Sequence, residues 1–176
     1  MPIGTIVSQD KSGTVDVGSV IIVQVSKGAE PTPITIPVFT SESQAISWAS
    51  TNGFTIGMTT RSYSNDYSVG IIYDQSPVAS SSHIQGSVYI SFTVSLGKPE
   101  VPDFFGQSLA SANSSISSLN IHGANLTITV SSEEFSDSIE SGKIISQSVT
   151  GETSTGTVVS VVVSKGAQPE GDGGEE

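Results

Sequence analysis

The sequence predicts an α+β protein made of tandem modules, each with one α-helix packed on a three-stranded β-sheet and the modules arranged linearly. Two observations carry this prediction: a long internal period, and apolar residues that alternate with polar ones before the end of each repeat. The endings "VSKG", "VSLG" and "VSKG" place glycines at 28, 97 and 166, which are 69 residues apart. A fixed period of this length indicates a repeated structural module.

The last strand of each repeat is predicted from alternation with a period of two. In the third copy Val159, Val161 and Val163 share one face, as expected for a strand buried on one side. Apolar residues occupy the equivalent positions of the other two copies: Ile90, Phe92, Val94, and Ile21, Val23, Val25. Glycines at 18, 86 and 156 precede these strands and fit turns that need permissive backbone dihedrals.

A second strand is predicted from a motif that occurs three times: "GTIVSQ" (4–9), "GIIYDQ" (70–75) and "GKIISQ" (142–147). The apolar centre and the opening glycine indicate a strand that pairs with the closing strand of the same repeat. Each copy ends in glutamine, whose neutral amide is neither an acid nor a base. We therefore expect Gln9, Gln75 and Gln147 to tie a strand end or turn through amide hydrogen bonds, and not to catalyse a reaction.

Helices are predicted in the two longer copies. The segment 101–120 spaces its apolar residues as one face of a helix requires, and 41–53 does so more weakly. We expect Gly53 and Asn120 to end these helices in the left-handed conformation. A further strand follows each helix, in "FTIGMTT" and "ANLTITV". The apolar helix positions are Leu109, Ala112, Ile116 and Leu119, and Ala45, Trp48 and Ala49.

These elements divide the chain into a partial module at 1–28, complete modules at 29–97 and 98–166, and a disordered acidic tail at 167–176. Proline-bearing linkers, "AEPTP" and "KPEVP", favour extended connections between modules. The first copy contains only a hairpin, and we expect that the chain boundary falls inside a module. An isolated hairpin is marginally stable in water, so residues 4–28 should be mobile, lean on the next module or pair with another chain.

Composition excludes several classes of function. The net charge of −11, with one arginine and five lysines, opposes binding to a nucleic-acid backbone. The absence of cysteine excludes disulfides, thiolate metal sites and thiol nucleophiles. No signal peptide or membrane span is visible, which predicts either a cytosolic protein or a fragment of a longer one. We expect no cofactor and no contact of this fragment with the membrane.

Catalytic and metal-binding patterns are weak. Ser8 and Ser95 both begin a Ser-x-x-Lys sequence, which penicillin-binding enzymes use with the serine at a helix start. Here Ser8 precedes a turn and Ser95 ends a strand, and a module of roughly 70 residues lacks room for an enclosing cleft. His83 and His122 have no ligand partner at suitable spacing and are expected at the surface. The acidic run 133–141 is expected to be a solvated loop.

The repeats resemble the PASTA domains, which are extracellular modules of penicillin-binding proteins and of bacterial membrane serine/threonine kinases. The resemblance rests on "VPDFFGQS" before a helix, on "GKIISQS" and "GIIYDQSP", and on the endings "VSVVVSKG" and "VIIVQVSKG". It implies a part of a membrane-anchored signalling protein, outside the cytoplasmic membrane of a Gram-positive bacterium. It also implies binding of peptidoglycan fragments, with beta-lactams as mimics in some members.

The segment 59–70 is the candidate ligand-binding loop. Arg61 is the only arginine of the chain and suits bidentate capture of a carboxylate, while Tyr63 and Tyr67 could stack on sugar rings. The equivalent segment of the last copy, 131–141, is acidic and would repel a carboxylate. The sequence therefore predicts a binding module without catalysis. A spacer or dimerisation stalk is the alternative, and the parent protein could carry a kinase or a transpeptidase domain.

Overall fold

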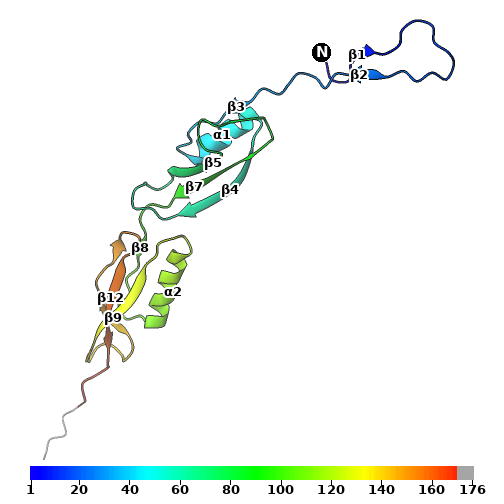
Figure 1. Ribbon diagram of the computed structural model, residues 1–176. Helices are drawn as coiled ribbons and strands as arrows, with labels where there is room; N and C mark the ends of the chain where they lie inside the picture. The colour runs from blue at the N-terminus through cyan, green and yellow to red at the C-terminus, as the bar shows by residue number, and fades with distance from the viewer. Residues whose placement is uncertain (170–176) are drawn as a thin grey trace, which may run out of the picture.

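The computed structural model describes residues 1–169 and has three parts that follow one another along an extended line (Figure 1). They are an N-terminal hairpin, a first complete module that contains helix α1, and a second complete module that contains helix α2. The predicted α+β class and the tandem, linear arrangement are confirmed. The predicted tail at 167–176 lies outside the described residues from 170 onward.

The hairpin consists of β1 (Ile6–Gln9) and β2 (Val23–Val25), which pair antiparallel with Ile6 opposite Val25. The remaining residues between the two strands form a long connection at the far end of the molecule (Figure 1). Among residues 1–169, no hydrogen bond or ion pair joins this hairpin to either complete module.

The first complete module contains one helix and two small sheets. Helix α1 (Glu42–Asn52) is followed by β4 (Thr55–Ser62), β5 (Ile72–Ser76) and β7 (Tyr89–Ser95). The three strands form one sheet in the order β4-β7-β5, in which β4 is parallel and β5 antiparallel to β7. A second pair, β3 (Ile34–Thr35) with β6 (Ser82–His83), fastens the entering chain to the module.

The second complete module repeats this topology. Helix α2 (Leu109–Asn120) precedes β9 (Thr127–Glu134), β10 (Ile144–Gln147) and β12 (Val158–Ser164), in the sheet order β10-β12-β9. Here β8 (Glu100–Val101) and β11 (Gly151–Glu152) form the two-stranded pair at the entrance. As the motif predicted, the strand that contains the repeated glutamine pairs with the closing strand in all three copies.

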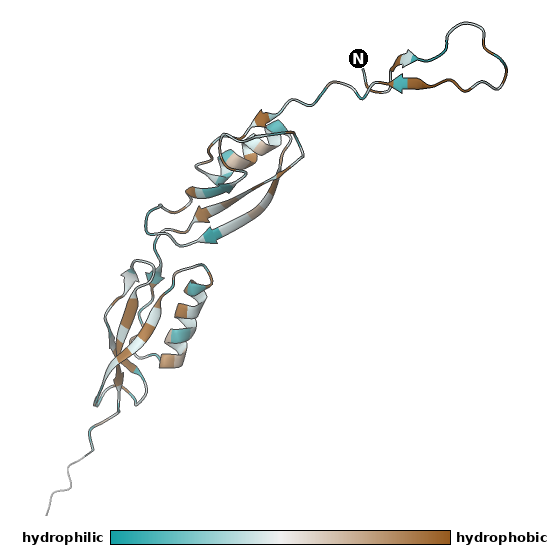
Figure 2. Cartoon of the chain, in the orientation of Figure 1, coloured by the Kyte–Doolittle hydropathy of each residue, from teal (hydrophilic) through white to brown (hydrophobic). Residues whose placement is uncertain are grey.

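Each complete module has its own core between helix and sheet, and the predicted alternation is confirmed there. The inward residues of β7 and β12 are at most 9% exposed: Ile90, Phe92, Val94, Val159, Val161 and Val163. The equivalent hairpin residues Ile21, Val23 and Val25 are 41–50% exposed, because no helix lies over them. Figure 2 accordingly shows hydrophobic residues on the strands of the uncovered hairpin.

The two helices end differently, and one prediction about them is wrong. Gly53 adopts the left-handed conformation (φ 68°), and its amide donates to the Ala49 carbonyl, as predicted. Asn120 does not cap its helix in this way, because the chain continues right-handed through Ile121 and turns at Gly123 (φ 78°). The Asn120 side chain instead exchanges two hydrogen bonds, of 2.8 and 2.7 Å, with the backbone of Leu126.

The structural interpretation of the repeated glutamine is confirmed. The Gln147 side chain accepts a hydrogen bond from the Phe104 amide and donates to the carbonyls of Pro102 and Val149. Gln75 makes the same three kinds of bond in the first module, to Phe39, Pro37 and Pro77. The glutamine therefore joins the segment before the helix to the turn after the strand. These are contacts that a neutral side chain with two donors and one acceptor can make.

Candidate joint site between the complete modules

The loop of residues 62–69 leaves the end of β4 and contacts the second module. The Tyr63 amide donates a 2.9 Å hydrogen bond to the His122 carbonyl, which also accepts one of 3.0 Å from the Ser62 hydroxyl. The half-buried Tyr63 side chain packs against the core of the second module. Because only the four residues from Leu96 to Pro99 separate β7 from β8, the two modules are held close together here.

A second set of polar contacts closes the other side of this joint. The Asn65 side chain donates a 2.9 Å hydrogen bond to the Thr155 hydroxyl and accepts one of 2.8 Å from the Thr155 amide. Lys98 in the linker lies 3.9 Å from the carboxylate of Glu152. Two reciprocal bonds on one amide fix the orientation of both partners, so the joint is specified at the level of individual side chains.

Ser95 holds the backbone of the loop from inside. Its side chain is 1% exposed, and its hydroxyl donates a 2.7 Å hydrogen bond to the Tyr67 carbonyl and accepts one of 2.9 Å from the Gly97 amide. Both capacities of the hydroxyl are thereby used. The geometry gives Ser95 a structural role in place of the nucleophilic role that its Ser-x-x-Lys pattern resembles.

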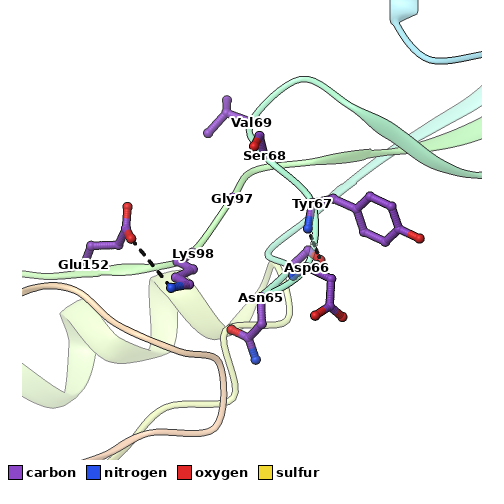
Figure 3. A pocket seen from close by; sticks show the side chains of 9 residues that line it. Asn65, Asp66, Tyr67, Ser68, Val69, Gly97, Lys98 and Glu152 are labelled. Carbon is purple, nitrogen blue, oxygen red and sulfur yellow. Dashed lines mark hydrogen bonds and ion pairs between the residues drawn. The ribbon is translucent and has the colours of Figure 1, made fainter.

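A cavity of about 360 Å³ opens at this joint, between the loop, the linker and the second module (Figure 3). Tyr67 is the aromatic residue of the lining, with its ring on the side away from Lys98 and Glu152 (Figure 3), and Lys98, Asp66 and Glu152 are the charged residues. The remaining wall is formed by Ser64, Asn65, Ser68, Val69 and Gly97. The cavity therefore has charged side chains of both signs in its lining, and it needs both modules because Glu152 belongs to the second.

The three predicted ligand residues are not gathered in one place. Arg61 is 48% exposed and forms a 2.8 Å ion pair with Glu42 at the start of α1, while Tyr63 faces the second module. Tyr67 is the member of the set that lines the cavity, and its ring stacks on that of Tyr73 with centroids 5.1 Å apart. A carboxylate ligand would have to compete with Glu42 for Arg61.

Sequence reasoning missed Lys98 and Glu152. Their positions 54 residues apart carry no local pattern, and they meet only because β8 pairs with β11. The signal that could have indicated Lys98 is its place in the short linker directly after the repeated glycine. A charged residue in this linker lies next to any cavity that the two modules enclose.

Of the other residues selected from the sequence, Ser8 and His83 lie away from this joint, whereas His122 takes part in it through its backbone carbonyl. The Ser8 hydroxyl donates to the Gln24 side chain on the exposed hairpin, at 2.8 Å. His83 contacts the Ser81 hydroxyl at 3.1 Å, and the His122 ring contacts the Arg61 carbonyl at 3.3 Å. Within residues 1–169, no three His, Asp or Glu side chains gather as a metal site requires. None of the helices in this range is long and apolar enough to cross a membrane.

Comparison with known proteins agrees with the repeat pattern. Residues 99–165, which form the second complete module, match the model of the PASTA domain. A curated relative is described as "Probable serine/threonine-protein kinase" of Clostridium acetobutylicum and is 27% identical over 170 residues. The alignment covers 93% of this chain and 25% of that protein, so the chain spans a quarter of its curated relative.

Two solved structures from Staphylococcus aureus are also similar. The entire extracellular region of the Ser/Thr kinase PrkC is 27% identical, covering 96% of this chain and 59% of that one, with a TM-score of 0.41. A three-PASTA-domain structure of a Ser/Thr kinase is 28% identical, covering 94% and 82%, with a TM-score of 0.40.

These comparisons define a class at the level of the module: residues 99–165 match the PASTA domain, and the chain is similar to a part of a probable bacterial serine/threonine kinase. The family match is to a repeat module, and it covers the second complete module of this chain. One of the two solved structures is described as an entire extracellular region of a kinase, and the other as the three PASTA domains of a kinase.

Proposed function

We propose that this chain belongs to the extracellular region of a membrane-anchored serine/threonine kinase of a Gram-positive bacterium, where it binds peptidoglycan fragments. The PASTA match and the kinase relative support this assignment over a penicillin-binding parent. Binding of a cell-wall fragment on the outer side of the membrane would be signalled to a kinase domain that lies elsewhere in the parent protein.

The observation that carries the proposal is the cavity at the joint with Tyr67 in its wall. A muropeptide combines sugar rings with a short peptide that bears carboxylate and amino groups. The stacked Tyr67 and Tyr73 offer a flat aromatic surface on which a sugar ring packs, and Lys98 offers an ammonium group to a carboxylate. Arg61 is the second cation of this loop region, and binding a carboxylate there would break its ion pair with Glu42.

The second module should bind such a ligand less well. The residues at the positions of Tyr63 and Tyr67 are Phe135 and Ile139, and the segment 131–141 carries four acidic groups without an arginine. One charge-assisted hydrogen bond to an exposed carboxylate contributes about 1.5–3 kcal/mol at most, and salt reduces it. Affinity should therefore lie in the high-micromolar to millimolar range.

The test is titration of the ¹⁵N-labelled chain with a soluble muropeptide, followed by amide NMR shifts. The wild type should shift around 61–73 and at Lys98 and Glu152, and Tyr67→Ala, Lys98→Ala and Arg61→Ala should weaken the response. Tyr89→Ala is the matched control, since this tyrosine is 69% exposed and lies outside the lining of the cavity. Shifts confined to 101–166, or unchanged in the three variants, would contradict the site. A soluble beta-lactam in the same titration tests the alternative ligand.

A second candidate is a structural role as a spacer or dimerisation stalk. The tight joint favours it, because Tyr63 and Asn65 fix two modules end to end without any ligand. Muropeptide at millimolar concentration that shifts no amide resonance would favour this role over binding.

A further inference from the structure

A groove of about 290 Å³ on the first complete module shares no lining residue with the cavity at the joint. Its walls come from the segment before α1 and from β5 with the turn that follows it. The buried core residues Phe39 and Ile72 line it, together with Val38, which is 63% exposed, and Val78, which is 69% exposed. Its volume is close to the lower limit of about 300 Å³ for ligand pockets, so it suits a small ligand.

The second module shows that the fold does not require these exposed valines. The position of Val38, one residue before the phenylalanine whose amide donates to the repeated glutamine, is Asp103 in the second module. The position of Val78, directly after the residue whose carbonyl accepts from that glutamine, is Thr150. A polar residue is therefore compatible with the module at each place, and the two valines are a feature of the groove in the first module.

Neighbouring modules leave this groove open. Asp103 and Thr150 are exposed in the second module, although the first module precedes it and contacts it. Val38 and Val78 are exposed although the second module contacts the first through residues 62–69. The exposure of the two valines therefore does not arise from the lack of a neighbouring module.

Asp74 gives the groove a negative charge. It is exposed on β5 and forms no ion pair within residues 1–169, and no lysine or arginine is among the described residues that line the groove. The adjacent Tyr73 is half-buried, and its ring is stacked on that of Tyr67 with centroids 5.1 Å apart. An ammonium group is the charge that complements this carboxylate, and an aromatic ring nearby adds to the attraction.

The segment that carries Val38 leaves main-chain groups free for a peptide. Within residues 1–169 the Val38 amide and carbonyl form no hydrogen bond. The neighbouring Pro37 carbonyl and Phe39 amide are both bound to the Gln75 side chain, at 3.0 and 2.9 Å, which holds the segment in place. An extended peptide beside this segment can pair with the two free groups while its side chains contact the valines.

We propose that the groove is a binding site for a short peptide with small aliphatic side chains and a free amino group. Val38 and Val78 contact the side chains, and the Asp74 carboxylate accepts a hydrogen bond from the ammonium group. The proposal does not rest on muropeptide binding at the joint, because the two sites have separate linings. Binding is weak, since the groove is small and its ion pair is exposed to solvent.

The test is titration of the labelled full chain with alanyl-alanyl-alanine amide, followed by amide and methyl NMR shifts. This probe has methyl side chains and an amino group but no sugar and no carboxylate, so its result is separate from that of the muropeptide titration. Signals of Val38, Asp74 and Val78 should shift, with a dissociation constant in the millimolar range. The N-acetylated probe should bind about two- to fivefold more weakly, as expected when an exposed ion pair is lost.

Asp74→Asn should weaken binding of the free amine by the same factor without affecting the acetylated probe, and Asp74→Glu should bind like the wild type. Asp137→Asn is the matched control, because it removes one charge from an exposed site on the second module and so reports attraction by the net charge of −11 alone. Val38→Thr with Val78→Thr keeps the shape of the groove and should weaken both probes about threefold or more. Val158→Thr, at a valine that is 51% exposed outside the groove, should not.

Four outcomes would each overturn the proposal: no shift at the groove, equal binding of the two probes, equal weakening by Asp74→Asn and Asp137→Asn, or normal binding by the double valine variant. Amide spectra of the free variants should match the wild type outside the substituted positions, which shows that they are folded. A muropeptide that binds at the joint while the groove stays silent toward the peptide probe would refute this inference and leave the proposed function intact.

Discussion

Replacing Gln147 with alanine should destabilise the second module far more than its half-buried position suggests. The side chain makes three hydrogen bonds that join the segment before α2 to the turn after β10. Each such bond contributes about 0.5–1.5 kcal/mol net, and alanine leaves the Phe104 amide and two carbonyls without this partner. Water reaches part of the site, so we expect a loss of about 2–4 kcal/mol in the free energy of unfolding.

The measurement is urea unfolding of the full chain followed by NMR signals assigned to each module. Gln9→Ala is the matched control, because Gln9 makes one such bond, to the Lys11 carbonyl, in a hairpin without a covered core. Gln147→Glu should lower the free energy of unfolding by an intermediate amount, since glutamate keeps the acceptor for the Phe104 amide but loses both donors. A cost below about 0.5 kcal/mol for Gln147→Ala would refute the view that this side chain holds the module together.

Three further changes test the cores, the joint and the hairpin. Phe104→Ala, at a side chain with 0% exposure, should cost the second module about 3–5 kcal/mol in urea unfolding, and a loss below about 1 kcal/mol would contradict its place in the core. Tyr63→Ala should release the joint, so that residual dipolar couplings of the two complete modules no longer fit one alignment tensor; a single tensor in the variant would show that other contacts suffice. Removal of residues 1–28 should leave the amide shifts of both complete modules and their unfolding midpoints unchanged, and a lowered midpoint of the first module would reveal a stabilising contact with the hairpin.

Local patterns in the sequence were sufficient to predict most of the fold. Alternation predicted the inward residues of β7 and β12, because a strand covered on one face requires that period. The end of α2 could not be predicted in this way. Both glycine and asparagine tolerate the left-handed conformation, but the longer connection after α2 lets Asn120 bond to Leu126 from within the helix.

The candidate site was less predictable because its geometry depends on contacts between distant residues. Arg61 was selected for its charge, yet its partner Glu42 is brought close only when α1 packs on the sheet. Tyr63 was selected as an aromatic residue in a loop, and its environment is the core of the other module. Residue type indicated a functional region, whereas the tertiary structure decided that one of these tyrosines serves the joint and the other lines the cavity.

The short linker at Gly97–Pro99, together with the bonds from Asn65 to Thr155, also sets the rotation of one module about the long axis relative to the next. Helices α1 and α2 therefore face directions that are fixed with respect to each other (Figure 1). A row of modules connected by such joints has a defined rotation from one module to the next as well as a defined length. A surface on one module then lies at a set angle from a surface on its neighbour, and inserting a single residue at Lys98 would alter that angle while leaving both modules folded.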